Sequence, residues 1–151
     1  MIRKLMSVFA AFAVLISVAA APATAQDDSL YKKLAIQISD NNPGTFDKAL
    51  NVASNFSRNA TENGFIPLVE VVAFNAGMHA YRLDTSPVLD RLQQISESYS
   101  DLKFIACGDT MDLMERKEGV RPEISEYAEI VPAGVARLMQ LNAQGYFVIR
   151  P

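Results

Sequence analysis

The sequence predicts an α/β fold in which a parallel sheet carries helices on both faces. Five short apolar stretches read as strands, at 33–39, 67–74, 102–106, 127–131 and 146–149. Helical patterns separate them, so each strand leads into a helix rather than into a hairpin. The second stretch is apolar along most of its length, as expected for a strand covered on both faces. Right-handed crossovers between such units give a sheet with helices on both faces.

The first two predicted helices have clear starts and stops. Turn residues at 40–44 lead into a helix at 44–62, whose apolar positions recur every three or four residues. Gly64 follows its last turn and is expected to end it. The second helix is predicted to begin at Ser86 as the capping residue, with Pro87 in the first helical position.

The last two helices follow the third and fourth strands. Asp109 or Thr110 is expected to cap a helix that runs to about residue 117. An irregular polar connection at 119–126 then leads to the fourth strand. The final helix follows the turn at 132–134, and Gly145 is expected to end it. Its predicted apolar face consists of Val135, Leu138, Met139 and Asn142.

The first 25 residues have the three parts of a signal peptide. Arg3 and Lys4 give a positive start, and residues 5–21 form an apolar run. The small residues Ala23 and Ala25 form a cleavage pattern before Gln26. The run is shorter than the roughly 20 residues of a spanning helix, so no stable membrane anchor is expected. The sequence therefore predicts an exported protein, periplasmic or secreted, with one domain at 26–151.

The charge of the chain excludes two classes of partner. The 151 residues include 14 basic and 17 acidic side chains, a formal net charge of −3. Loss of Arg3 and Lys4 with the signal peptide leaves 12 basic residues against 17 acidic ones, a net charge of −5. No basic cluster remains at 26–151. Binding to nucleic acid or to anionic lipid therefore has no electrostatic support.

The stretch Phe104–Met111 (FIACGDTM) is the strongest candidate for a functional site. It reads as a buried strand that ends at Cys107, the only cysteine, followed by Gly108 and a helix start. Ligands bind at this edge of open parallel sheets. The backbone N–H groups of Asp109 and Thr110 are expected to stabilise a thiolate, which is the reactive form of cysteine. A buried structural cysteine is the alternative interpretation.

Other loops are expected to open on the same edge of the sheet. They contain Asp40 and Asn41 after the first strand, Asn75 and His79 after the second, and 132–134 after the fourth. The first loop lacks both the phosphate-binding lysine and the three-glycine pattern of nucleotide sites. No cofactor is predicted.

Two other chemistries remain open on sequence alone. His79, the only histidine, could form a nucleophile–base couple with Cys107 if the fold brought them together. A non-catalytic binding module for a small ligand or for copper(I) is also possible. Cys107, Met111 and Met114 would supply soft sulfur ligands for the metal, although methionines at this spacing more often fill a core. No resident metal is predicted.

The chain resembles the DsrE/DsrF family of small sulfur-relay proteins, in an exported single-domain branch. The resemblance covers nearly all of 26–151 and rests on several short stretches in a fixed order. These are 33–40 with Pro43, 69–77 (VEVVAFNAG), 86–88 (SPV), 104–111 (FIACGDTM), 131–135 (VPAGV) and 146–151 (YFVIRP).

The resemblance implies a three-layer α/β/α fold with a five-stranded, mostly parallel sheet, as in DsrE and YchN-like proteins. It also implies a sulfur carrier or sulfurtransferase that holds sulfane sulfur as a persulfide on Cys107. Gly108, Asp109, Thr110, Asn75, His79, Asp40 and Asn41 are the expected supporting residues. The implied partners are a thiol or sulfane-sulfur donor, an acceptor, and further copies of the chain, with the Cys107 loop near a subunit boundary.

Overall fold

The computed structural model describes residues 28–151, so the predicted signal peptide lies outside the described residues. Five parallel strands form one sheet in the order β4-β3-β2-β1-β5. Their bounds are β1 Tyr31–Ile38, β2 Ile66–Ala73, β3 Leu102–Cys107, β4 Ala128–Val131 and β5 Phe147–Ile149. All five predicted strands are present, each displaced by no more than two residues, and the α/β/α fold class is confirmed.

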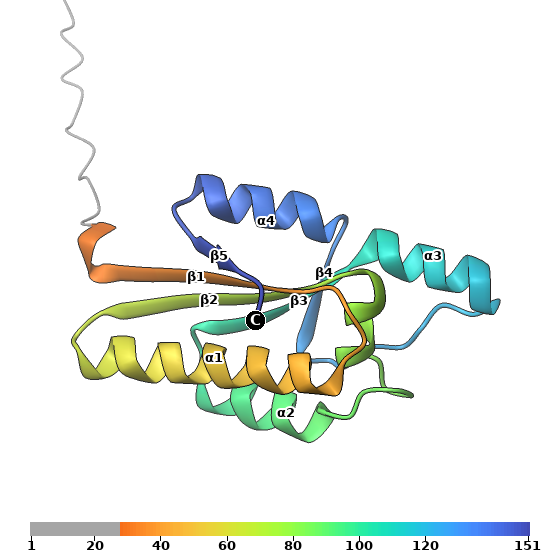
Figure 1. Cartoon of the computed structure of the whole chain (residues 1–151), viewed down its shortest axis with the longest axis horizontal. Coiled ribbons are helices and arrows are strands. Elements are labelled where there is room, and N and C mark those ends of the chain that lie inside the picture. The colour runs from red at the N-terminus through yellow and green to blue at the C-terminus, as the bar shows by residue number, and fades with distance from the viewer. Residues whose placement is uncertain (1–27) are drawn as a thin grey trace, which may run out of the picture.

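Three layers are visible in Figure 1, with the sheet in the middle. Helices α1 (Pro43–Glu62) and α2 (Leu89–Ser98) cover one face, and α4 (Gly134–Ala143) covers the other. Helix α3 (Gly108–Glu118) lies beyond the carboxyl edge and packs against the 3-10 helix η2 (Asn75–Ala80). A short 3-10 helix, η1 (Asp28–Leu30), precedes β1. None of the helices in this described part is long and apolar enough to cross a membrane.

The two faces of the sheet bury cores of unequal size. The larger core lies under α1 and α2 and includes Ile36, Phe46, Val71 and Phe104. The smaller one lies under α4 and has five buried residues: Ala35, Val72, Ile105, Leu138 and Leu141. Alternate residues of each strand point to opposite faces, which explains why apolar runs rather than alternating patterns mark the central strands.

Local signals place the first helix correctly. The side chain of Asn42 accepts a hydrogen bond from the Gly44 N–H at 2.8 Å, and Pro43 occupies the first turn. Gly64, with φ +78°, follows the helix end, as predicted.

Three expectations about helices are wrong. Helix α2 begins at Leu89 rather than at Pro87, because the Ser86 hydroxyl donates to the Ala80 carbonyl and accepts from the Val88 N–H in a separate turn. Helix α3 begins at Gly108, with Cys107 rather than Asp109 or Thr110 as the N-cap residue. Helix α4 buries Leu138 and Leu141 and leaves Val135 and Met139 exposed, so its predicted apolar face was only partly right.

The order of the strands places a crevice at the carboxyl end of β3. The chain crosses the sheet from β1 to β4 and then returns to place β5 beside β1, with α4 on the opposite face. The connection therefore changes face after β4, next to β3. The strand ends are level, since Ala73 pairs with Ala106 and Cys107 pairs with Val131. Ligands in open α/β sheets bind at such a point.

Candidate functional site

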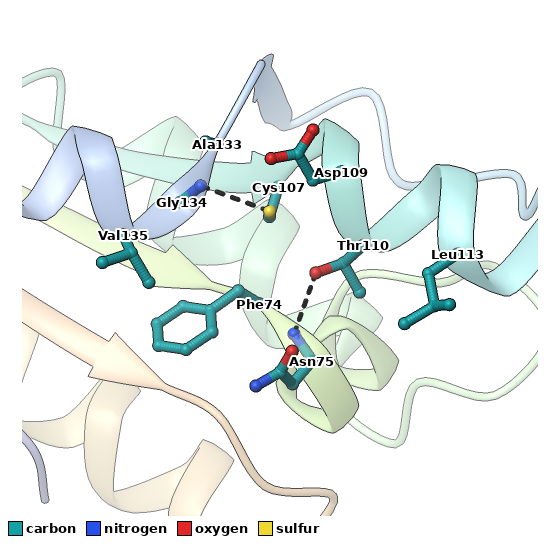
Figure 2. Close-up of a pocket in the computed structure, with 9 residues that line it drawn as sticks. All are labelled: Phe74, Asn75, Cys107, Asp109, Thr110, Leu113, Ala133, Gly134 and Val135. Atoms are coloured by element: carbon teal, nitrogen blue, oxygen red, sulfur yellow. Dashed lines mark hydrogen bonds between the residues drawn. The ribbon is translucent and has the colours of Figure 1, made fainter.

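A cavity of about 290 Å³ opens at this point and has Cys107 in its wall. Cys107 is the last residue of β3 and the N-cap of α3, and only 5% of it is exposed. Figure 2 shows the sulfur between the amino ends of α3 and α4. The lining residues come from the loops after β2, β3 and β4: Phe74, Asn75, Cys107, Asp109, Thr110, Leu113, Ala133, Gly134 and Val135.

The sulfur of Cys107 receives a backbone hydrogen bond from the start of α4. The Gly134 N–H donates to Sγ, with 3.2 Å between the nitrogen and the sulfur. Gly134 is the first residue of α4, so the partial positive charge of that helix end also faces the sulfur. The N–H group and the helix end thus both present positive potential to Sγ.

Two glycines allow the amino ends of α3 and α4 to meet at the sulfur. A Cβ at Gly134 would lie 3.2 Å from the Cβ atoms of both Cys107 and Phe74. A Cβ at Gly108 would lie 3.1 Å from the Val131 carbonyl oxygen. Contacts this short require the neighbours to shift, so both positions favour glycine for its lack of a side chain.

The donor to the sulfur differs from the one expected. The Asp109 N–H donates instead to the Pro132 carbonyl at 2.9 Å, which ties α3 to the loop before α4. The Asp109 side chain is exposed, and within residues 28–151 it makes no hydrogen bond to the sulfur. Thr110 is buried, and its hydroxyl oxygen accepts the Asn75 N–H at 3.0 Å. Asn75 has φ +50°, a conformation that asparagine tolerates better than most residues.

The structure divides the predicted supporting residues into two groups. Asn75, Asp109 and Thr110 line the Cys107 cavity, and Gly108 lies beside it. Asp40 and Asn41 do not line it: Asp40 accepts the Asn42 N–H and pairs with Arg150 at 3.6 Å. This loop serves the start of α1, which is its structural role.

His79 does not line the cavity of Cys107 either. It lies in η2 and lines a neighbouring cavity, where its Nδ1 is 2.8 Å from the Thr85 hydroxyl oxygen. The structure shows no hydrogen bond between His79 and the sulfur among the described residues. The geometry therefore gives no support to a Cys–His couple.

The methionines of the copper(I) interpretation are directed elsewhere. Met111 is buried in the core under α1 and α2, and the Met114 sulfur accepts a long hydrogen bond from Arg82 at 3.8 Å. Neither methionine lines the Cys107 cavity. Among the residues that the structure describes, no cluster of three or more His, Cys, Asp or Glu side chains could hold a metal.

A partly buried ion pair holds α4 on the sheet near the site. Glu70 projects from β2 beneath α4 and is 4% exposed. The Arg137 Nε donates to it at 2.8 Å, and Nη2 donates to its second oxygen. The hydrogen bonds to Glu70 raise the pKa of the Arg137 guanidinium. Because Arg137 is one turn after Gly134, this pair also fixes where the sulfur donor lies.

The sequence interpretation placed the loop 132–134 at this edge but missed the contact of Gly134 with the sulfur, and it missed Phe74 and the Glu70–Arg137 pair. A signal existed for each of them. Gly134 stands at a predicted helix start, where glycine is expected only if a side chain would not fit. Phe74 is the last residue of the predicted apolar strand 67–74, at the edge where ligands bind. Glu70 is a lone charge within the apolar run 67–74, and such residues are seldom buried without a partner.

Comparison with known proteins supports the fold and gives no information on function. No protein-family model matches this chain, and no curated protein matches it. A solved structure, the protein of unknown function MTH1491 from Methanobacterium thermoautotrophicum, superposes with a TM-score of 0.62 and 23% identity. The match covers 80% of this chain and 99% of that one. The two proteins share the same fold, with a five-stranded parallel sheet between helices in this chain.

Proposed function

We propose that this protein is an exported sulfur carrier of the DsrE/DsrF type, with Cys107 as the sulfur-bearing residue. The observation that carries the proposal is the position of Sγ, which accepts the Gly134 N–H at the meeting point of two helix amino ends. The resemblance of the stretches around Cys107 to this family supports the same role. Export is proposed from the N-terminal 25 residues of the sequence.

The transfer needs no cofactor. The Cys107 thiolate attacks the outer sulfur of a donor R–S–S⁻ or of thiosulfate. A new S–S bond forms on Cys107, the donor S–S bond breaks, and R–S⁻ or sulfite leaves with the electron pair. The resulting persulfide then gives its outer sulfur to an acceptor thiolate and restores the cysteine. No net oxidation occurs in either step.

The surroundings of Cys107 suit this chemistry. Cys107 is 5% exposed and lines a cavity of about 290 Å³, which admits a small donor. Phe74, Ala133 and Val135 give the cavity an apolar wall. Exclusion of water strengthens the N–H interaction with the anionic sulfur and protects a persulfide from side reactions.

The first prediction concerns the adduct on Cys107. Treatment of the folded protein with thiosulfate or polysulfide should add about 32 Da, the mass of one sulfur atom, to the intact protein. A small thiol should then remove the increment. The Cys107→Ser variant should show no adduct while retaining the circular dichroism spectrum of the wild type.

A Cys107 thiol that does not react in the folded protein would overturn the proposal. Cys107 is the only cysteine, so its reactivity can be measured without interference from other thiols. A thiol that reacts in denaturant but stays unmodified in the folded protein would show that Cys107 is structural.

A further inference from the structure

A second cavity of about 390 Å³ adjoins the Cys107 cavity. The two share Asn75, Thr110 and Leu113, so they meet above the hydrogen bond between the Asn75 N–H and the Thr110 hydroxyl. Figure 2 shows Leu113 on α3, beyond Thr110 on the side away from the sulfur. The remaining lining residues of the second cavity are Ala76, His79, Met114, Lys117 and Glu118.

The two cavities follow one face of α3. Thr110, Leu113, Met114 and Lys117 are spaced by three or four residues and therefore lie along one side of the helix. Helix η2 supplies the opposite wall through Asn75, Ala76 and His79. The space thus forms a groove between α3 and η2, which we call the α3–η2 groove. It leads from Cys107 at one end to Lys117 at the other.

The charged groups at the end of the groove remote from Cys107 leave one cation with free hydrogen-bond donors, and such a group binds an anionic ligand. Glu118 uses both carboxylate oxygens to accept hydrogen bonds from Arg82 at 2.8 Å, and the same guanidinium also pairs with Asp84, so the oxygens of Glu118 are occupied within the protein. Lys117 has no ion-pair or hydrogen-bond partner among the described residues. His79 also lines this cavity and uses Nδ1 with Thr85, while Nε2 has no hydrogen-bond partner among the described residues. The ammonium of Lys117 is therefore the charged group of the second cavity whose hydrogen-bond donors are free to meet a ligand.

The length of the groove sets the size of the ligand. Ten residues of helix separate Cys107 from Lys117, a rise of about 15 Å. Helix side chains lean toward the amino end, so the ammonium lies nearer to the sulfur than its Cα does, on the order of 10 Å away. Volumes of about 290 and 390 Å³ together match a ligand of tripeptide size.

We propose that the α3–η2 groove binds a low-molecular-weight acidic peptide thiol, or the persulfide of one. Its sulfur lies at Cys107 and a carboxylate lies at Lys117 and His79. This inference rests on the proposed function, because it names the class of donor or acceptor for that site. It adds a specificity residue, Lys117, outside the cavity that contains the reacting sulfur.

An unreactive probe separates this inference from sulfur transfer. S-methylglutathione has the required size and carboxylates but cannot exchange sulfur. Titration into the wild-type protein, followed by amide NMR, should shift the signals of Asn75, His79 and Lys117. Lys117→Glu should weaken the affinity about five- to tenfold, because an attractive charge becomes a repulsive one.

Arg116→Glu is the matched control. Arg116 is the exposed neighbour of Lys117 on α3, it does not line the groove, and its reversal changes the net charge equally. The affinity of the Arg116→Glu variant for S-methylglutathione should stay within twofold of that of the wild type. No binding, or an equal loss in both variants, would overturn the inference even if Cys107 forms a persulfide. Binding that depends on Lys117 would support the groove even if no persulfide forms.

Discussion

At the scale of single residues, Gly134 decides the environment of the sulfur. Its N–H is the donor to Sγ, and its missing side chain is what allows the close approach to Cys107 and Phe74. Cys107 and Gly134 are 27 residues apart in the chain, so their contact is a product of the fold. The polar partner of the thiol is therefore a backbone N–H group, which no side-chain pattern in the sequence could reveal.

A methyl group at position 134 should slow the reaction of Cys107. Gly134→Ala places a Cβ 3.2 Å from the Cys107 Cβ, so the start of α4 must shift and the N–H contact must lengthen. The rate of alkylation by iodoacetamide should fall about threefold to tenfold, since a hydrogen bond to a charged group is worth about 1.5–3 kcal/mol and is only partly lost. The measurement is the loss of free thiol with time.

Ala136→Gly is the control for a general weakening of α4. Ala136 is exposed in the same turn, and glycine there costs about 1 kcal/mol of helix stability without contact to the sulfur. Its alkylation rate should match the wild type. If both variants change the rate alike, helix stability rather than the sulfur contact controls Cys107.

At the scale of elements, the strands could be predicted from sequence because each is an apolar run between turn residues. The start of α2 could not be predicted in this way. Ser86 and Pro87 are residues typical of a helix start, but the Ser86 hydroxyl donates to the Ala80 carbonyl at 2.6 Å and the helix begins later, at Leu89. The buried face of α4 also stayed ambiguous. Val135 and Met139 are as apolar as Leu138 and Leu141. The position of α4 on the sheet determines which pair is buried.

The candidate site was predictable only where residues follow one another in sequence. The sequence predicted that β3 ends at Cys107 and that a helix follows at once, although Thr110 lies inside α3 rather than at its cap. The strand order then decided which loops meet, and no local pattern encodes it. That order brings the loops after β2, β3 and β4 together at the Cys107 cavity, while Asp40 and Asn41 after β1 serve α1 instead.

Arg82 joins three elements behind the α3–η2 groove. Its side chain is 6% exposed and binds Asp84 at 2.7 Å and Glu118, at the end of α3, at 2.8 Å. Arg82 also forms an isolated bridge with Ile124 in the connection before β4. Hydrogen bonds from Arg82 lower the pKa of the Asp84 and Glu118 carboxyls.

This cluster should make part of the stability of the protein sensitive to acid. The two carboxyls have depressed folded-state pKa values, so their contribution is complete above the ordinary values of 3.8 and 4.5. It is lost as the pH falls through the lower folded values. The difference in unfolding free energy between wild type and Arg82→Gln should therefore shrink below about pH 4.

Urea unfolding at several pH values between 7 and 2 measures that difference. Arg58→Gln is the control, because the Arg58 side chain binds the neutral amide of Asn55 at 2.9 Å. The difference in unfolding free energy between wild type and Arg58→Gln should not depend on pH. A wild-type advantage over Arg82→Gln that stays constant down to pH 2 would contradict the role given to the two carboxylates.

At the scale of the whole molecule, apolar side chains remain uncovered beside the Cys107 cavity. Val135 and Met139, one turn apart on α4, are 53% and 70% exposed, and Leu113 on α3 is 38% exposed. Val135 and Leu113 also line the Cys107 cavity, so the apolar surface continues to its rim. One helix covers this face of the sheet, whereas two cover the other.

We predict that a second copy of the chain covers this surface, in a homo-oligomer of two to six subunits with the Cys107 cavity near the boundary. Identical chains commonly bury such a patch through closed symmetry. Light scattering at micromolar concentration should give a multiple of the chain mass. Met139→Glu should lower that mass toward one chain, because it places a charge in the buried contact. Gln94→Glu, exposed on α2 across the sheet, should leave it unchanged. A single-chain mass that does not rise with concentration would contradict the prediction, and each α3–η2 groove would then act within one subunit.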